Sequence, residues 1–240
     1  MTNPWARDRA TSFYLGMALA GLIVAAIGFS TTYVLPIARS SFSAPWYVHV
    51  HGAACLGWLL LVIVQSQHVL AGRTPLHRNL GKAALPLAVT LWAAGIATGH
   101  WASARDLPSQ GAAAKTAFLG TMTGLTLFQI IVGAAIAWRK RPDWHKRMIL
   151  LATIHVLWPA FFRLRHLLPD VPRPEIWLAV VVAYSPILVA AIRDRRRYGK
   201  VHPVWLFIAP ALVAEQSIEF AYFDSAPWRR LGQAAFDLFS

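Results

Sequence analysis

Seven long apolar runs, separated by short polar segments, dominate the hydrophobic pattern of the chain. Backbone N–H and C=O groups in hydrocarbon must be hydrogen-bonded within their own segment, so a crossing helix needs about 20 mostly apolar residues. Each run reaches about this length. The pattern therefore predicts an all-α, polytopic membrane protein with seven transmembrane helices in a single domain, residues 1–240. The predicted spans are 12–35, 46–71, 83–102, 113–138, 146–168, 175–192 and 203–224.

Prolines inside four of these runs predict local distortions. A proline lacks an N–H group and its ring clashes with the carbonyl four residues earlier, so it kinks a helix that continues through it. Neighbouring helices in a bundle tolerate such kinks. The residues concerned are Pro86, Pro159, Pro186 and Pro210.

Composition and charge agree with a protein dissolved in lipid. Hydrophobic residues make up 57% of the chain and charged residues 14%, with a mean hydropathy of +0.47. The net charge of +13 is carried by short clusters between the apolar runs, where basic residues orient helices and meet anionic lipid headgroups. We therefore expect the bilayer as partner and no nucleic acid. Partner proteins of a membrane complex and a homo-oligomer both stay open.

The distribution of Lys and Arg predicts the orientation. The N-terminus and the loops after spans two, four and six, with the helix ends that adjoin them, hold 15 of these residues, and the opposite side holds 8. Because cytoplasmic loops carry the excess of basic residues, the N-terminus is predicted in the cytoplasm and the C-terminus outside. Residues 1–10 lack the pattern of a cleaved signal peptide, so we expect the first span to be retained.

Three similar segments place a histidine beside basic residues. They are RTPLHRNLGK at 73–82, KRPDWHKRM at 140–148 and YGKVHPVW at 198–205. Their histidines, His77, His145 and His202, are predicted at the cytoplasmic ends of helices three, five and seven. If the repeat has a purpose, they converge within about 12 Å of one another, because packed helix axes lie about 8–10 Å apart. Ordinary interfacial loop chemistry is the alternative.

These segments, together with VHVHGAACLGWLLLVIVQ upstream, resemble a family of uncharacterised bacterial multi-pass membrane proteins. That family carries an LHRRLG-like box, a His-Lys/Arg-Arg box and a Gly-Arg-x-His-Pro box, which match His77, His145 and His202. The resemblance runs from about residue 45 to 228 and departs at EQSIE, 215–219. It implies a compact helical protein of the bacterial inner membrane, and it brings no assigned activity.

A first candidate site lies at the cytoplasmic ends. His68 is predicted at the same depth as the three repeated histidines, and imidazoles from separate helices can hold a transition metal or the iron of haem b. Arg78 and Arg147 would form a positive rim suited to haem propionates, lipid phosphate or another anion. Histidines that only pack or meet lipid headgroups are the alternative.

A second candidate site lies deeper and toward the outside. Glu215 and Glu219 are acids within the last span and share one helix face, and His49 and His51 lie at similar height on the second helix. Ionisable groups in a span are costly unless they face one another, water or the bundle interior. We expect Glu219 to pair with a helix-two histidine, His51 before His49, as a metal site, a proton or quinone site, or a static pair.

His155, the most deeply placed histidine, is a further candidate ligand, with hydrogen-bonded packing as its alternative.

Three functions remain open on these residues. A haem- or metal-binding redox protein that exchanges electrons with quinone is favoured narrowly. A metal-dependent membrane hydrolase acting on lipid is the second hypothesis, and a proton-coupled carrier or non-catalytic complex subunit is the third. The chain lacks GxSxG, a Walker loop, HExxH and a lysine midway along the last span, which argues against the hydrolases, ATPases and retinal proteins that these motifs mark.

Overall fold

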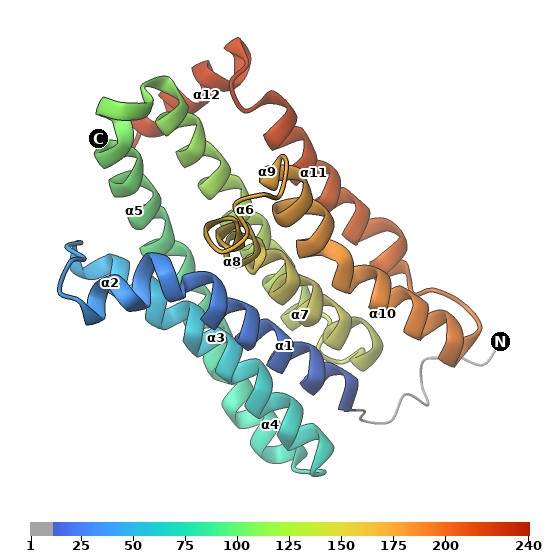
Figure 1. The fold of residues 1–240 in the computed structure, drawn as a ribbon. Helices are drawn as coiled ribbons and strands as arrows, with labels where there is room; N and C mark the ends of the chain where they lie inside the picture. Colours follow the sequence, from blue (N-terminus) through green and yellow to red (C-terminus); the bar gives the residue numbers. More distant parts are fainter. Residues whose placement is uncertain (1–11) are drawn as a thin grey trace.

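The computed structural model describes residues 12–240, and all regular structure in this part of the chain is helical. Seven helices in it are long and apolar enough to cross a membrane, as predicted. They run side by side as one bundle (Figure 1). These helices are Ser12–Ala38, Trp46–Leu70, Thr74–Gln110, Ala112–Ala137, Pro142–His166, Pro174–Tyr198 and Val204–Tyr222.

Several of the seven consist of shorter consecutive elements. The first comprises α1 (Ser12–Phe29), η1 (Ser30–Val34) and α2 (Leu35–Ala38); the second is α3 (Trp46–Leu70); the third comprises α4 (Thr74–Leu80), η2 (Gly81–Ala83) and α5 (Ala84–Gln110). The fourth is α6 (Ala112–Ala137), and the fifth comprises α7 (Pro142–Val156), α8 (Trp158–Arg163) and η3 (Leu164–His166). The sixth comprises α9 (Pro174–Ile176), η4 (Trp177–Val182) and α10 (Ala183–Tyr198), and the seventh comprises η5 (Val204–Ile208) and α11 (Ala209–Tyr222). An eighth helix, α12 (Ala226–Asp237), follows the last span.

The predicted boundaries hold within a few residues except in the third helix and at the end of the sixth, which continues to Tyr198. The prediction of 83–102 was too short at both ends, because the segment read as a basic loop forms α4 and continues through η2 into α5. Pro75 lies in the first turn of α4, where the N–H that proline lacks has no helical partner anyway. The helix ends at Gly111, whose φ of +58° suits glycine. His77 therefore lies inside a helix and not in a loop.

The four prolines predicted to distort a span, and Pro36 in addition, each follow an irregular segment, whereas Pro108 lies within regular helix in α5. The residue four positions before Pro36 lies in η1, the one before Pro186 ends η4, and the one before Pro210 lies in η5. All three segments are π-helical. Pro86 likewise follows the 3-10 segment η2, and Pro159 follows the break between α7 and α8. These irregular turns arise because proline has no N–H to donate to the carbonyl four residues earlier, and its ring clashes with that carbonyl.

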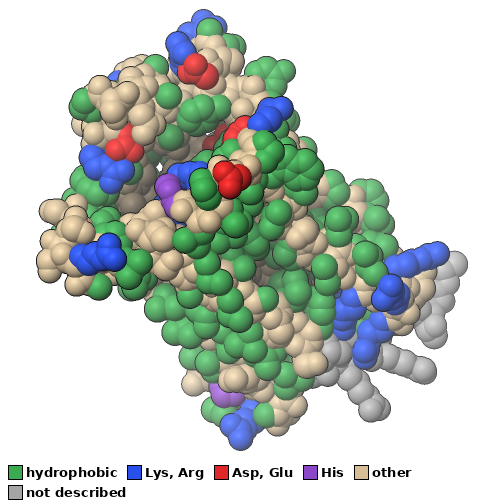
Figure 2. Space-filling model, viewed as in Figure 1, with side chains coloured by type: hydrophobic (Ala, Val, Ile, Leu, Met, Phe, Trp, Pro, Cys, Tyr) green, Lys and Arg blue, Asp and Glu red, His purple; other side chains and the backbone are tan. Residues whose placement is uncertain are grey.

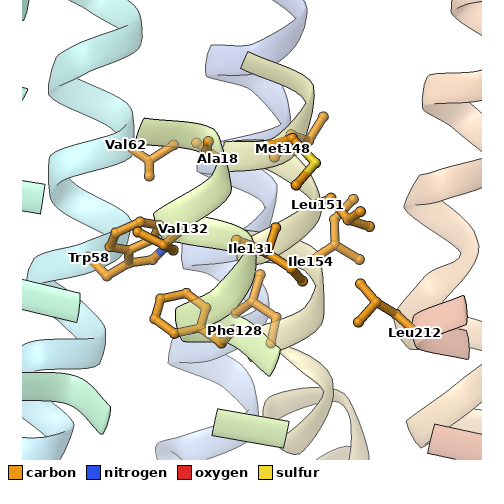
Figure 3. Close-up of a cluster of buried hydrophobic side chains, with 14 of the residues drawn as sticks. Ala18, Trp58, Val62, Phe128, Ile131, Val132, Met148, Leu151, Ile154 and Leu212 are labelled. Atoms are coloured by element: carbon orange, nitrogen blue, oxygen red, sulfur yellow. The ribbon is translucent and has the colours of Figure 1, made fainter. Parts of the chain in front are cut away.

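The bundle core is formed mainly by α3, α6 and α7, with α11 reaching it from the side (Figure 3). The Trp58 and Phe128 rings meet edge to face, with centroids 5.0 Å apart. Trp58 is 1% exposed, and its indole N–H donates to the Thr153 hydroxyl at 3.1 Å. The one polar atom of this large side chain is therefore satisfied inside the core.

The outer surface of the bundle is apolar. Large side chains such as Ile23, Leu188 and Phe207 are 59%, 65% and 71% exposed, and charged side chains gather at the two ends in the view of Figure 2. Such a surface suits hydrocarbon and not water. We call the end that holds Arg73, residues 139–141 and residues 195–200 the basic end, and the other the opposite end. The two arginines that precede residue 12 and the predicted cytoplasmic N-terminus lie outside the described residues.

At the opposite end, α12 docks on α6, a feature that the hydropathy pattern did not predict. Phe236 is buried against Phe118 and stacks on the His100 ring, with ring centroids 4.4 Å apart. The Lys115 ammonium donates to Gln233 at 2.8 Å, and Gly232 lies against the backbone of α6 at Lys115. The His100 ring is therefore packed under α12.

Candidate functional site

Two glutamates of α11 lie inside the bundle with no cation beside them among residues 12–240. Glu219 is 5% exposed, and its carboxylate accepts a hydrogen bond from Gln216 at 3.3 Å. Glu215, one turn earlier, is half-buried, and its Oε2 atom is buried without a hydrogen-bond partner in the described residues. The spacing of four places both acids on one helix face, as the sequence predicted.

The wall opposite these acids is α6. The Glu219 carboxylate lies against Gly120, where a methyl group would overlap it. Thr123 of the same helix faces Glu215. Glycine at position 120 thus allows a carboxylate to approach the α6 backbone closely. The contact with Gly120 and the hydrogen bond from the Gln216 amide position Glu219.

A second hydrogen-bonded set lies close to the acids. The His155 Nε2 atom lies 3.0 Å from the Gly124 carbonyl, and its Nδ1 atom lies 2.9 Å from the Tyr184 hydroxyl. Because a carbonyl only accepts, the neutral ring carries its proton on Nε2, and Nδ1 accepts from tyrosine. Tyr184 lies within electrostatic range of both glutamates. We call Glu219, Gln216, Glu215, Tyr184 and His155 the interior polar chain; all but Gln216 carry ionisable groups, and they come from α7, α10 and α11.

Both ring nitrogens of His155 are therefore engaged within the bundle. Both ring nitrogens are hydrogen-bonded and the side chain is 1% exposed. In this structure His155 thus has the hydrogen-bonded packing that was the alternative to the ligand hypothesis.

The predicted pairing of Glu219 with a helix-two histidine does not form. The His51 ring faces α5, where Nδ1 lies 3.1 Å from the Leu91 carbonyl, and its Nε2 atom lies 3.6 Å from the Cys55 sulfur. His49 is exposed and lies 2.8 Å from the Tyr33 hydroxyl. The sequence gives the height of each residue along the bundle. It does not give the rotation of each helix about its axis, which decides which side chains meet.

The residues of the second candidate site do not come together as a metal site either. Among residues 12–240, no three His, Cys, Asp or Glu side chains come together as a metal site would require. The three-ligand set that a metal-dependent hydrolase needs is thus not formed by the candidates His49, His51, His155, Glu215 and Glu219.

At the basic end, two of the repeated histidines meet. The His77 and His145 rings lie with centroids 6.3 Å apart at an interplanar angle of 82°. The His145 Nδ1 atom lies 2.8 Å from the Ala135 carbonyl, so Nδ1 carries the proton and Nε2 keeps its lone pair. His77 Nδ1 is buried without a hydrogen-bond partner in the described part of the chain. His68 lies within electrostatic range of His77. We call His77 and His145 the histidine pair.

The third repeated histidine has a different environment. His202 is 1% exposed, its ring meets Trp144 edge to face at 5.0 Å, and its Nε2 atom lies 3.6 Å from the Asp143 carboxylate. The Val204 N–H donates to Nδ1 at 3.2 Å. His202 therefore packs on the two residues that precede His145. Its convergence with the histidine pair within about 12 Å stays a prediction.

Sequence reasoning missed a buried ion pair beside His202. The Arg147 guanidinium donates to both carboxylate oxygens of Asp194, at 2.7 and 2.8 Å, and to the Asp143 carbonyl at 2.8 Å. The Trp205 indole also donates to Asp194, at 2.9 Å. Arg147 is 0% exposed and Asp194 1%. Arg147 was predicted to form a positive rim for an anion with Arg78, but this pairing buries its guanidinium in the bundle, whereas Arg78 is exposed.

The environment of His202 predicts a pH dependence of stability. Burial, and then the positive charge of Arg147, lower its pKa from 6.5 to about 4. As pH falls, the unfolded chain takes up this proton first, so the stabilisation present above about pH 6.5 is lost progressively toward about pH 4. We expect the unfolding midpoint of the wild type to fall more steeply over this window than that of His202→Gln. Parallel curves would contradict the assignment.

Comparisons with known proteins add no relative: no family model, no curated protein and no solved structure matches the chain.

Proposed function

We propose that the chain is an integral membrane protein of the bacterial inner membrane that binds a proton at Glu215 and Glu219, and that it acts as a proton-coupled carrier. The observation that carries this proposal is the position of two neighbouring carboxyl groups inside the seventh helix, facing α6, without a cation beside them in residues 12–240. An isolated charge inside a membrane costs several kcal/mol. Two such charges side by side cost more, so at least one carboxyl group holds a proton.

The partners of these acids support exchange of that proton. A structural salt bridge would fix the charge of Glu219, whereas a single amide and a glycine wall leave it free to ionise when water or a substrate approaches. Tyr184 and His155 continue the chain away from the acids. Chains of this kind mark proton relays in membrane proteins.

Irregular backbone beside the acids supports movement. The π-helical segment η5 and Pro210 directly precede the turn of α11 that carries Glu215. In the neighbouring sixth helix, η4 and Pro186 flank Tyr184. Interrupted helices near the midplane are typical of transporter binding sites, so these two helices can shift relative to α6 without losing the rest of the bundle.

The orientation belongs to the same proposal. The basic end, which holds the histidine pair and the Arg147–Asp194 ion pair, faces the cytoplasm, because basic loops remain on that side. The acids and α12 then lie toward the outside.

Transport assays test the carrier. Proteoliposomes that enclose a pH-sensitive dye are exposed in turn to sugars, amino acids, carboxylates and amines. We expect at least one class to drive a change of internal pH with the wild type, and Glu219→Gln to abolish it. Glu175→Gln is the matched control, because Glu175 lies in α9 at the surface with its side chain 37% exposed. No proton flux with any class, or equal flux with Glu219→Gln, would contradict the proposal.

A second candidate function rests on the histidine pair. Two imidazoles from separate helices meet edge to face, and the carbonyl that accepts from His145 Nδ1 leaves Nε2 as a potential ligand atom, which axial ligation of haem or binding of a transition metal would require. Such a cofactor would supply one-electron redox chemistry, with quinone as the partner. The ultraviolet-visible spectrum and metal content of the purified protein test this candidate. A Soret band or bound metal that is lost in His145→Ala supports it, and the absence of both from the wild type contradicts it.

A further inference from the structure

Arg163 of α8 is a cation that lies inside the bundle, toward its opposite end. It is half-buried, and its guanidinium lies 4.3 Å from the centroid of the Phe29 ring on α1. His51 and Cys55 of α3 lie within electrostatic range of it. Cys55 is nine residues into α3, about 13 Å along the helix from Trp46. Arg163 therefore extends into the bundle between α1, α3 and α8, and not outward to the membrane surface.

No acid in residues 12–240 neutralises Arg163. The side chain forms no salt bridge in this part of the chain, and the charge that acts on it most is a second cation, Arg165. Arg165 is also half-buried and donates to the Phe162 carbonyl of its own helix at 3.0 Å. Asp170, the next acid along the chain, is exposed. The end of the fifth helix thus carries two positive charges with no negative charge beside Arg163.

The acid of the first eleven residues lies too far away in the chain to compensate this charge. Asp8 is the one acid before Ser12 and precedes it by four residues, which span at most about 14 Å. The helix α1 covers about 25 Å between Ser12 and Phe29. Asp8 therefore stays beyond the reach of Arg163, and no acidic side chain of the protein compensates this arginine.

The guanidinium of Arg163 also has an open hydrogen-bonding edge. Its Nη1 atom donates to the Pro159 carbonyl at 3.0 Å, whereas Nε and Nη2 donate to no group in residues 12–240. These two atoms carry parallel N–H groups that match the two oxygens of a carboxylate. Arginines within membrane spans pair with other groups or mark the path of a substrate. A bound carboxylate would satisfy both N–H groups and the charge.

The surroundings of this edge favour a carboxylate with an apolar body over a phosphate. The His51 Nδ1 atom lies 3.1 Å from the Leu91 carbonyl and therefore carries the proton, while Nε2 lies 3.6 Å from the Cys55 sulfur. Neither ring nitrogen is thus left to donate to an anion. A phosphate has three oxygens that need donors. The ring of Phe29 instead offers an apolar contact.

Aromatic side chains connect this region to the helix that carries the acids. Phe162, which precedes Arg163, packs on Phe220, which follows Glu219, with ring centroids 6.2 Å apart. Trp158 of α8 meets the same Phe220 ring at 5.8 Å. In the view of Figure 2, the surface at this end is hollowed between α5 and α8, with Lys or Arg and His side chains at its edge. A solute that binds beside α8 therefore bears on α11 through direct packing.

We propose that Arg163 binds the carboxylate of a small organic acid between α1, α3 and α8, and that this acid is the substrate of the carrier. The Nε and Nη2 atoms hold the two carboxylate oxygens, and the apolar body of the acid packs against Phe29. Together with a proton on Glu219, the bound anion crosses the membrane without net charge, which avoids the cost of moving a charge through hydrocarbon. The assignment as substrate rests on the proposed carrier function, whereas the binding site does not.

Pairs of ligands test the chemical class without any mutation. Isothermal titration calorimetry of the purified full chain compares butyrate with butyramide, benzoate with benzamide, and both acids with inorganic phosphate. Each amide has nearly the shape of its acid but no charge. We expect at least one acid to bind about tenfold or more tightly than its amide and than phosphate, as a charged hydrogen-bonded pair requires. Equal affinity for acid and amide, tighter binding of phosphate, or no binding of either acid would overturn the proposal.

Three variants test the residue. We expect Arg163→Gln to weaken binding of the acid about tenfold or more, and Arg163→Lys to weaken it about threefold, because lysine keeps the charge and loses the two-point geometry. Arg230→Gln is the control, since Arg230 is exposed on α12 at the same end, and its affinity should equal that of the wild type. The unfolding midpoint without ligand shows that each variant is folded. Unchanged affinity in both Arg163 variants, or an equal loss in Arg230→Gln, would overturn the site.

The site and the carrier fail separately. Binding of the acid at Arg163, with no proton flux when carboxylates are added to proteoliposomes, would retain the site and overturn its role in transport. Proton flux driven only by sugars, amino acids or amines, with no acid bound, would retain the carrier and overturn the site. We expect carboxylates to drive the flux in the wild type and in Arg230→Gln, and Arg163→Gln to lose it.

Discussion

Arg147→Met is expected to lower the free energy of unfolding by about 3–5 kcal/mol, because it removes one partner of a buried ion pair and leaves the other charge without its two-point partner. The abandoned group is Asp194, which is 1% exposed and is then left with the Trp205 indole and with Arg193 at 3.2 Å. The midpoint of reversible unfolding in a denaturing detergent measures the change.

Two further variants separate the ion pair from general damage. Arg147→Met combined with Asp194→Leu removes both charges, and we expect it to recover much of the loss, since apolar replacement of a whole buried pair is often neutral. Arg195→Met, at an exposed position of the same basic segment, should change the free energy by less than about 0.5 kcal/mol. A double variant no more stable than the single one would contradict the account.

Gly120→Ala and Gly133→Ala, two identical changes in α6, are expected to act in opposite directions. A methyl group at position 120 overlaps the Glu219 carboxylate, whereas at position 133 it meets nothing within 4 Å. We expect Gly120→Ala to destabilise the protein by about 1–3 kcal/mol through overpacking. Gly133→Ala should stabilise it by about 0.5–1 kcal/mol, since alanine has the higher helix propensity.

The same pair of variants links stability to the acids. Because Gly120→Ala must displace the carboxylate, we also expect it to impair the solute-driven proton flux in proteoliposomes, while Gly133→Ala leaves that flux intact. If both substitutions gave equal unfolding midpoints and equal flux, Glu219 would not lie against Gly120 as the structure has it.

The hydropathy pattern was sufficient for the seven spans because lipid requires a continuous apolar length, which a sequence displays directly. The hydropathy pattern did not predict the helices that are rich in polar residues. The segment with Arg73, His77 and Arg78 was interpreted as a loop, although most of it forms α4, and α12 is too amphipathic for a span. Positions of prolines predicted the irregular segments, because the constraint that proline imposes is local.

The candidate site was predictable only in part. Acids in an apolar run identified Glu215 and Glu219 without knowledge of the fold. Their partners were not predictable, because the rotation of each helix, and not height alone, turned His51 toward Leu91 and placed Gly120 at Glu219. Asp194 was missed since a single acid in RDRRR resembles a solvated charge run; its partner Arg147 comes from a distant helix.

Infrared spectroscopy of the purified protein in lipid tests most directly whether the acids in the seventh helix hold a proton. The C=O stretch of a protonated carboxylic acid is separate from that of carboxylate and shifts in D2O. We predict such a band at neutral pH in the wild type and in Glu175→Gln, and its loss or reduction in Glu219→Gln. Wild-type, Glu215→Gln and Glu219→Gln spectra that are identical in this region would show that neither acid carries the proton, and would contradict the account.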